Sequence, residues 1–264
     1  MILADCHVHS CFSSDADTPV EQIIEAAIAQ GRKYFYLTDH HDFDYPIGED
    51  GRDFQLPRED YTLRLEQLRD AYKDKIELRI GVEMGLMAHI ADKINDYVSG
   101  YPFDFVIGSI HTINLIDIAH NEYYEHKTKD EVHELYFKTM LECVKHCDYF
   151  DVLGHLDYVR RYGPFVDKSI DYAKYQELID EIYKLLIAKG KGIEINLSGY
   201  RVFDESLPNY DQVKRYYDLG GRIITIGTDS HQKEYIGKHL DKALKMCEAI
   251  GFKDITTFTK REVD

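Results

Sequence analysis

Short apolar runs rich in β-branched residues alternate with longer segments in which apolar residues recur every three or four positions. The short runs have the length of a strand, and the longer segments have the period of a helix. This alternation is typical of a parallel sheet whose strands are joined by crossover helices. It predicts strands at 2–6, 34–37, 77–82, 105–109, 150–153, 192–196 and 222–226, and helices at 19–30, 58–73, 129–147, 172–189, 210–219 and 236–250.

Seven such units can close into a barrel or lie open as a doubly wound sheet, and periodicity alone does not separate the two. An open nucleotide-binding sheet would favour a glycine-rich loop after the first strand. That strand instead continues into Asp5-Cys6-His7-Val8-His9-Ser10, which contains no glycine. We therefore expect an α/β fold, a single-domain barrel over residues 1–264.

Polar side chains with metal-binding groups follow six of the seven predicted strands. A single such residue is more often solvated or hydrogen-bonded than metal-bound, but loops at the carboxyl ends of barrel strands all meet on one face. The recurrence of such side chains at the ends of successive strands therefore predicts that they converge on a shared metal site. Imidazole and carboxylate ligands without an obvious thiolate suit Zn, Mn or Fe, and more than four ligands imply more than one ion. The residues are His7 and His9, His40, Glu83, His111, His155, and Asp229 with His231.

The same residues resemble an ordered motif set that spans nearly the whole chain. The runs His7-Val8-His9-Ser10, Thr38-Asp39-His40, Gly81-Val82-Glu83, Ser109-Ile110-His111, Gly154-His155 and Thr228-Asp229-Ser230-His231 are similar to those of the polymerase-and-histidinol-phosphatase (PHP) superfamily. The resemblance implies a distorted (β/α)₇ TIM-like barrel that holds two or three divalent ions.

The resemblance also implies how the ligands divide among the ions. One ion would be held by His7, His9, Glu83 and Asp229, and Glu83 would bridge to a second ion held by His111 and His155. His40 and His231 would hold a third ion with one more residue, usually a histidine six positions after the second histidine of the first motif. Asp15 stands at that position here, with Asp17 close enough to be a rival.

Two further segments resemble those that supply phosphate-binding arginines in histidinol-phosphate phosphatases. They are Gly154–Gly163, with Arg160 and Arg161, and Glu194–Arg201, with Arg201. The planar guanidinium of arginine suits a phosphomonoester dianion because it meets two oxygens at once. We favour Arg160 over Arg161 for this role.

The activity implied is hydrolysis of L-histidinol phosphate to L-histidinol and phosphate, a step of histidine biosynthesis. A hydroxide bridging two ions would attack phosphorus while Arg160 and Arg201 neutralise the phosphate. The proton donor to the leaving alkoxide could be a metal-held water, or Asp229, His231 or His40 if that residue is not fully committed to metal. The substrate's cationic groups favour an acidic entrance, for which Asp117, Glu122, Asp157 and Asp204 are candidates.

The composition of the chain limits the classes of binding partner that we expect. With 48 acidic and 32 basic residues among 264, the net charge of −16 disfavours a nucleic-acid groove. No stretch approaches the roughly 20 apolar residues that cross a bilayer. Five cysteines, an odd number, fit a reducing compartment better than a disulfide framework. We expect a cytoplasmic monomer or homodimer that acts on a small phosphomonoester.

Two alternatives remain at this stage. The same metal set could serve a phosphodiesterase that trims nucleotides or oligonucleotides, although the acidic balance and the arginine segments count against it. The chain could also be an inactive metal-binding scaffold, but none of the six motifs is missing.

Overall fold

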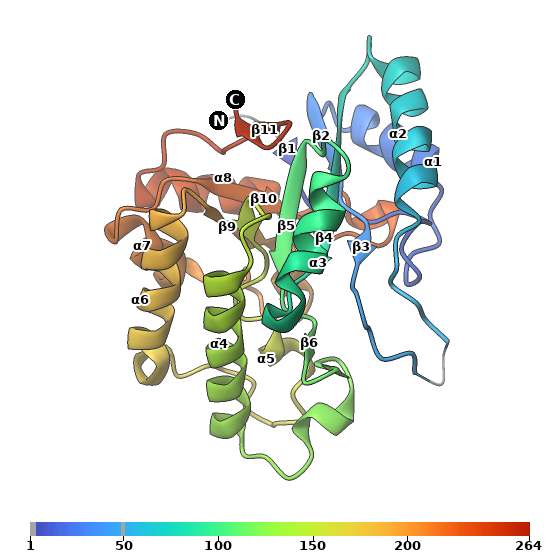
Figure 1. Ribbon diagram of the computed structural model, residues 1–264. Coiled ribbons are helices and arrows are strands. Elements are labelled where there is room, and N and C mark those ends of the chain that lie inside the picture. The colour runs from blue at the N-terminus through green and yellow to red at the C-terminus, as the bar shows by residue number, and fades with distance from the viewer. Residues whose placement is uncertain (1–3, 49–50) are drawn as a thin grey trace.

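Seven parallel strands follow one another around a single sheet in the computed structural model, which describes residues 4–48 and 51–264 (Figure 1). A short eighth strand, β3 (His40–His41), pairs beside β4. All pairings in this sheet are parallel, as crossover helices require. In spatial order the seven are β1 (Ala4–Asp5), β2 (Tyr34–Leu37), β4 (Glu77–Gly85), β5 (Phe105–Ser109), β8 (Val152–Leu153), β9 (Gly192–Asn196) and β10 (Ile224–Gly227).

The sheet closes through backbone hydrogen bonds between its first and last strands. Cys6 N donates to Ile226 O at 2.9 Å, and His9 N donates to Ser230 O at 2.9 Å. Between them, Asp229 N donates to His7 O at 2.8 Å. The seam runs mostly beyond the regular strands, so the barrel is closed but distorted. The fold expected from the sequence is confirmed.

Helices cover the outside of the barrel, and α4 and α6 lie side by side against it (Figure 1). The strands between are buried on both faces, for example at Phe35, Ile80, Val106 and Ile193. Near-continuous apolar strands are what a sheet buried on both sides needs. The helices are α1 (Val20–Ala29), α2 (Arg58–Tyr72), α3 (Ala91–Ser99), α4 (Lys129–His146), α5 (Val159–Tyr162), α6 (Tyr172–Ala188), α7 (Tyr210–Asp218) and α8 (Leu240–Ile250).

The predicted elements agree closely with these bounds, with a few differences. The helix expected at 236–250 begins only at Leu240, because Gly237 and His239 take left-handed backbone conformations with φ of 67° and 65°. The strand expected at 77–82 continues to Gly85. Part of the strand expected at 2–6 lies outside the described residues. Elements that we did not expect are α3, α5, β3, the hairpin β6 (Thr112–Ile113) with β7 (Ile116–Asp117), and the hairpin β11 (Phe258–Thr259) with β12 (Glu262–Val263).

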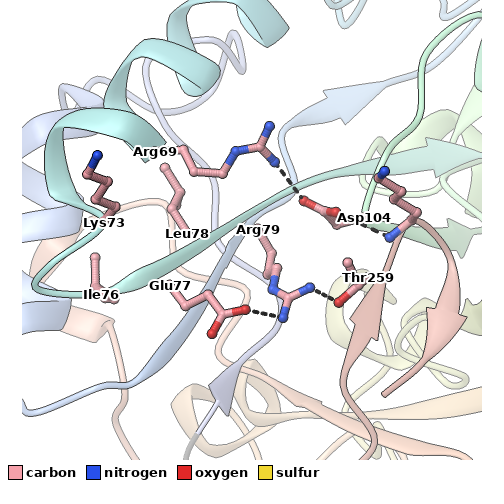
Figure 2. Close-up of a pocket in the computed structure, with 9 residues that line it drawn as sticks. Arg69, Lys73, Ile76, Glu77, Leu78, Arg79, Asp104 and Thr259 are labelled. Carbon is pink, nitrogen blue, oxygen red and sulfur yellow. Dashed lines mark hydrogen bonds and ion pairs between the residues drawn. The ribbon is translucent and has the colours of Figure 1, made fainter.

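The C-terminal hairpin covers the amino-terminal end of the barrel (Figure 2). Arg79, near the start of β4, donates to Thr259 and pairs with Glu77. Asp104, which precedes β5, accepts from Lys260 N at 3.2 Å and from Arg69 Nη1 at 3.3 Å. These contacts fasten the hairpin to this end of the barrel, beside a pocket that Arg69, Asp104 and Thr259 help to line (Figure 2).

Across residues 4–48 and 51–264, none of the helices combines the length and the apolar character that crossing a bilayer demands.

Candidate metal centre

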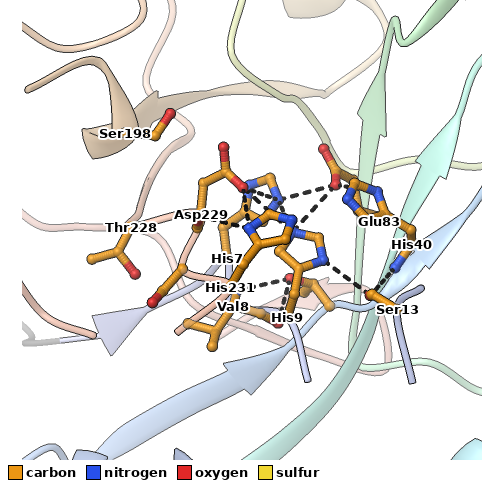
Figure 3. A network of polar contacts seen from close by, with 12 residues as sticks. His7, Val8, His9, Ser13, His40, Glu83, Ser198, Thr228, Asp229 and His231 are labelled. Carbon is orange, nitrogen blue, oxygen red and sulfur yellow. Dashed lines mark hydrogen bonds and ion pairs between the residues drawn. The ribbon is translucent and has the colours of Figure 1, made fainter. Parts of the chain in front are cut away.

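All nine ligand residues expected from the sequence lie in one connected cluster at the carboxyl-terminal end of the barrel. Figure 3 shows the part of it formed by His7, His9, His40, Glu83, Asp229 and His231. Glu83 on β4 is its centre, since five imidazoles lie within 3.5 Å of its oxygens. The nine are His7, His9, Asp15, His40, Glu83, His111, His155, Asp229 and His231.

The first group of ligand atoms sits at the seam of the barrel. His7 Nε2, His9 Nε2 and Asp229 Oδ1 all lie within 4.8 Å of one another. Glu83 Oε2 completes the group at 3.2 Å from His7 Nε2 and 3.5 Å from His9 Nε2. His7 and His9 reach the same point because residues two apart in an extended segment face the same side.

A second group lies around the other oxygen of the same glutamate. Glu83 Oε1 is 2.9 Å from His155 Nε2 and 3.2 Å from His111 Nε2. Ser109 Oγ also donates to Glu83 Oε1, at 2.7 Å. One carboxylate thus faces both groups, which is the geometry of a bridging ligand.

The third group is the most exposed. The rings of His40 and His231 each stack on His9 with centroids 4.1 Å apart, and one nitrogen of each of the three lies within 4.8 Å of the others. Asp15 Oδ2 is 3.1 Å from His231 Nε2 and 3.7 Å from His40 Nε2. Its rival Asp17 is exposed on the surface.

The charges of the cluster compensate one another only in part. Burial by itself would raise the pKa of the Glu83 carboxyl, but His7 and His111 hold it well below its usual range. Burial would likewise lower the pKa of His7, and the carboxylates of Glu194 and Glu83 raise it well above the ordinary value. His9 goes the other way: burial, with His231 and His40 nearby, lowers its pKa strongly.

Two buried atoms that face each other at 2.9 Å, Glu83 Oε2 and His40 Nδ1, make no hydrogen bond within the described residues. Two ring nitrogens, His7 Nε2 and His9 Nε2, face each other at 3.0 Å. Buried polar atoms normally find partners, so convergent atoms left without one are what a cation would satisfy. The donor set of imidazoles and carboxylates fits borderline divalent ions.

A shell of carboxylates behind the histidines was missed by the sequence reasoning. Glu194 Oε1 lies 2.6 Å from His7 Nδ1, and Asp42 Oδ1 lies 2.8 Å from His111 Nδ1. Such partners orient imidazole ligands. A signal existed for Glu194, because it is a charged residue within a strand expected to be buried on both faces. Asp42, two residues after His40, carried no comparable signal.

The three candidate arginines do not share one environment. Arg161 lines the metal pocket, and its Nη1 lies 3.6 Å from Asp229 Oδ2. Arg201 donates from Nη2 to Asp229 O at 3.0 Å. Arg160 is not among the residues lining that pocket. It is buried, and its Nη1 contacts Glu205 Oε1 at 2.7 Å and Asp157 Oδ2 at 3.4 Å. The expected preference for Arg160 over Arg161 therefore has no support from these contacts, and its role stays a prediction.

Asp229 itself is held in a left-handed conformation, with φ of 52°. Non-glycine residues rarely adopt this region, and such strain concentrates at functional sites. The bonds that Asp229 makes through its N to His7 O and through its O to Arg201 hold the conformation.

An aromatic pocket opens beside the metal cluster. Phe54, Tyr158 and Tyr162 line it together with the carboxylates of Asp42 and Asp117. Asp117 is thus the one acidic-entrance candidate among the residues lining this pocket. Glu122 and Asp204 are exposed elsewhere, and Asp157 is buried against Arg160 and Tyr172.

Comparisons with known proteins agree with this geometry. The PHP domain family matches residues 5–198. A histidinol-phosphatase of Lactococcus lactis is 36% identical over 98% of this chain and 96% of its own length. A probable histidinol-phosphatase of Clostridium acetobutylicum is also 36% identical, over 97% of each chain. The crystal structure of the L. lactis histidinol phosphate phosphatase, complexed with zinc, L-histidinol and phosphate, superposes with a TM-score of 0.90 at 37% identity, covering 99% of this chain and 98% of the other.

Proposed function

The chain belongs to the PHP domain family, and on that premise we propose that it is a metal-dependent phosphomonoesterase that hydrolyses L-histidinol phosphate to L-histidinol and phosphate. The observation that carries the proposal is the cluster of nine histidine and carboxylate ligands around Glu83, in a pocket that also contains Arg161. The relatives that match over nearly their full length carry the same activity in their names.

We propose a division of the ligands by proximity, in which His40 also lies within 4.8 Å of ligand atoms of Glu83 and His111. We assign His7, His9, Glu83 and Asp229 to one ion, Glu83, His111 and His155 to a second, and Asp15, His40 and His231 to a third. Zn, Mn and Fe suit this donor set. When bound, such ions supply Lewis acidity, because they activate water near neutral pH and offset negative charge on phosphate oxygens.

The arginines bind the phosphate. Arg161 faces the pocket next to Asp229 and can donate to a phosphate oxygen with little movement. Arg201 is anchored through the backbone oxygens of Thr228 and Asp229, and its Nη2 lies 4.0 Å from Asp229 Oδ2, although it lines a neighbouring pocket rather than the metal pocket itself. Guanidinium groups placed where charge develops stabilise the transition state of phosphoryl transfer.

The aromatic pocket binds the leaving group. Phe54, Tyr158 and Tyr162 offer ring faces to the imidazole of the substrate, and a cationic ring or amine gains from rings and carboxylates together. Asp117 is buried and adjacent, so it is the carboxylate that we assign to a cationic group of the substrate. This pocket is the feature that separates L-histidinol phosphate from other phosphomonoesters.

Proton transfer to the leaving alkoxide would fall to Asp229 or His231 only in a state in which that residue is not bound to metal. The side chain of His231 is 26% exposed, and both residues line the pocket beside Arg161. They therefore stand where a departing oxygen would be released.

One chain supplies every proposed ligand, so the centre does not need a second copy, and a monomer or a homodimer of independent sites both satisfy it. All five cysteines are free, and four of them are buried. A reducing compartment, the cytoplasm, is the setting that we propose.

The experiment compares substrates on one preparation. Purified protein loaded with Zn, Mn or Fe is given L-histidinol phosphate, a panel of other phosphomonoesters and a short oligonucleotide, and a Glu83→Gln variant measures the background. We expect the highest kcat/KM for L-histidinol phosphate. Faster cleavage of the diester, or equal phosphate release by the variant, would overturn the proposal.

A further inference from the structure

We propose that Glu194, a residue of β9, is a positioning residue that holds two metal ligands, His7 and His155, in their binding geometry. The inference rests on the metal centre of the proposed function but not on the identity of the substrate. Glu194 is 1% exposed and lies inside the barrel, behind the ligand cluster.

One oxygen of Glu194 sets the tautomer of His7. Oε1 lies 2.6 Å from His7 Nδ1, and a carboxylate can only accept, so Nδ1 carries the proton. The opposite nitrogen, Nε2, lies 3.2 Å from Glu83 Oε2 and 3.9 Å from Asp229 Oδ1, and it is the nitrogen that would give up its proton to bind an ion held among these ligands. This is the tautomer that a metal-binding imidazole must adopt.

The other oxygen fixes a segment of the second group. Glu194 Oε2 accepts from the backbone N of His155 at 3.0 Å and from Asn196 Nδ2 at 3.0 Å. The His155 ring, held by this backbone, points Nε2 at Glu83 Oε1. Glu194 therefore ties the strand at the barrel seam to the loop after β8, and ligands of both ions depend on it.

Gly227 packs tightly against the Oε1 side of Glu194. A Cβ on Gly227 would come within 2.4 Å of Glu194 Oε1 and 2.2 Å of His7 Cβ. A larger residue than glycine at position 227 would therefore displace the carboxylate or the His7 side chain that it contacts.

Three donors surround this carboxylate, and that makes Glu194→Gln a sharp test. If the amide nitrogen faces Asn196 and the His155 backbone, donor meets donor. If it faces His7 instead, the ring must accept at Nδ1, move its proton to Nε2 and lose its ability to bind metal. Glutamine has about the same volume as glutamate, but neither orientation of its amide satisfies all three donors and leaves His7 able to bind metal.

We expect Glu194→Gln to bind Zn²⁺ about 10- to 100-fold more weakly than the wild type at the tight sites. Affinity is measured by competition with a chromophoric chelator on metal-free protein, with no turnover involved. Glu142→Gln, at an exposed position of α4, is the matched control and should bind as the wild type does.

A compensating variant separates positioning from a general structural role. Adding Asn196→Asp to Glu194→Gln turns one opposing donor into an acceptor and returns the buried negative charge, so part of the affinity should recover. Wild-type affinity in Glu194→Gln alone would overturn the inference. So would a double variant that binds metal no better than the single one.

The tautomer can be read without any variant. Long-range ¹H–¹⁵N spectra of the zinc-loaded wild type should show the His7 proton on Nδ1, and a proton on Nε2 would refute the inference even if the variants do not fold. A wild-type chain that takes up no divalent ion would instead refute the proposed metal centre itself.

Discussion

Asp15 Oδ2 lies 3.1 Å from Nε2 of His231, at the most exposed of the three groups of ligand atoms. An oxygen therefore stands where the resembling family usually has a histidine nitrogen. Burial would raise the pKa of this carboxyl, but His40 and His231 lower it well below its usual range, so Asp15 is an anion ready to bind a cation.

Replacing Asp15 with asparagine removes that charge and keeps the shape. We expect Asp15→Asn to lose one bound ion and at least about tenfold in kcat/KM. Elemental analysis after gel filtration reports the ion, and Asp17→Asn is the control, because Asp17 is exposed and apart from the cluster. Equal metal content in the two variants would argue against a third site.

The two adjacent arginines should behave differently. Arg161→Ala removes a cation from the metal pocket and should reduce kcat/KM by about 10²- to 10³-fold. Arg160→Ala leaves Asp157 buried without its main cation and should cost about 3 kcal/mol of unfolding free energy, with a smaller kinetic loss. Steady-state kinetics and urea unfolding of both variants check this difference. A larger loss of kcat/KM in Arg160→Ala than in Arg161→Ala would contradict it.

Asp117 should determine selectivity for the leaving group. Its Oδ1 accepts from Ala119 N, and its Oδ2 accepts from the Tyr45 hydroxyl, so Asp117→Asn retains a similar shape without the charge. We expect KM for L-histidinol phosphate to rise about tenfold. A phosphomonoester with a neutral leaving group should be affected little. An equal rise in KM for both substrates would show that the charge of Asp117 does not discriminate between leaving groups.

Acid stability should depend on His133, a buried residue of α4. Burial, with Lys129 nearby, lowers its pKa to about 4. Between this value and the ordinary pKa near 6.5, the unfolded chain binds a proton that the folded chain excludes. The free energy of unfolding should therefore fall by up to about 2 kcal/mol as the pH drops through that window.

His133→Gln should flatten this pH dependence in urea titrations at pH 4.5 and 7. The slope should not vanish, because burial also lowers the pKa of His41 to about 4. An unchanged slope would mean that His133 is protonated in the folded chain.

Removal of metal should affect stability as well as activity. The cluster places Glu83 and Asp229 in a buried position, and a bound ion stabilises the folded state by mass action. We expect chelation to lower Tm and abolish turnover, and re-addition of Zn, Mn or Fe to restore both. Calorimetry of metal binding should also show proton release, because the ligands bind in their deprotonated forms.

The barrel could be predicted from the sequence because its strands are nearly continuous apolar runs, such as Phe105–Ser109 and Gly192–Asn196. The helix Ala91–Ser99 was not predicted, although Ile94 and Val98 stand one helical turn apart, because two buried positions in nine residues are a weaker signal than those of the longer helices. Eight of the nine expected metal ligands followed from one rule, that strand ends converge, and Asp15 followed only from the family resemblance.

The side chains that contact those ligands could be identified only from the structure. Arg160 and Arg161 are adjacent in the one-turn helix α5, and helical rotation sends them in different directions, one to Glu205 and the other to the metal pocket. Nothing in the order of two identical residues reveals which faces inward. Glu194 and Asp42 were missed for a related reason, since their role depends on which ring they meet.

The seam of the barrel joins the segment around His7 to the segment around Asp229. During synthesis the first histidines leave the ribosome more than two hundred residues ahead of the aspartate that completes their group. A polypeptide that ends before Asp229 therefore lacks a ligand of the first group. The proposed centre would be complete only after the segment around Asp229 has docked against the first strand, late in synthesis.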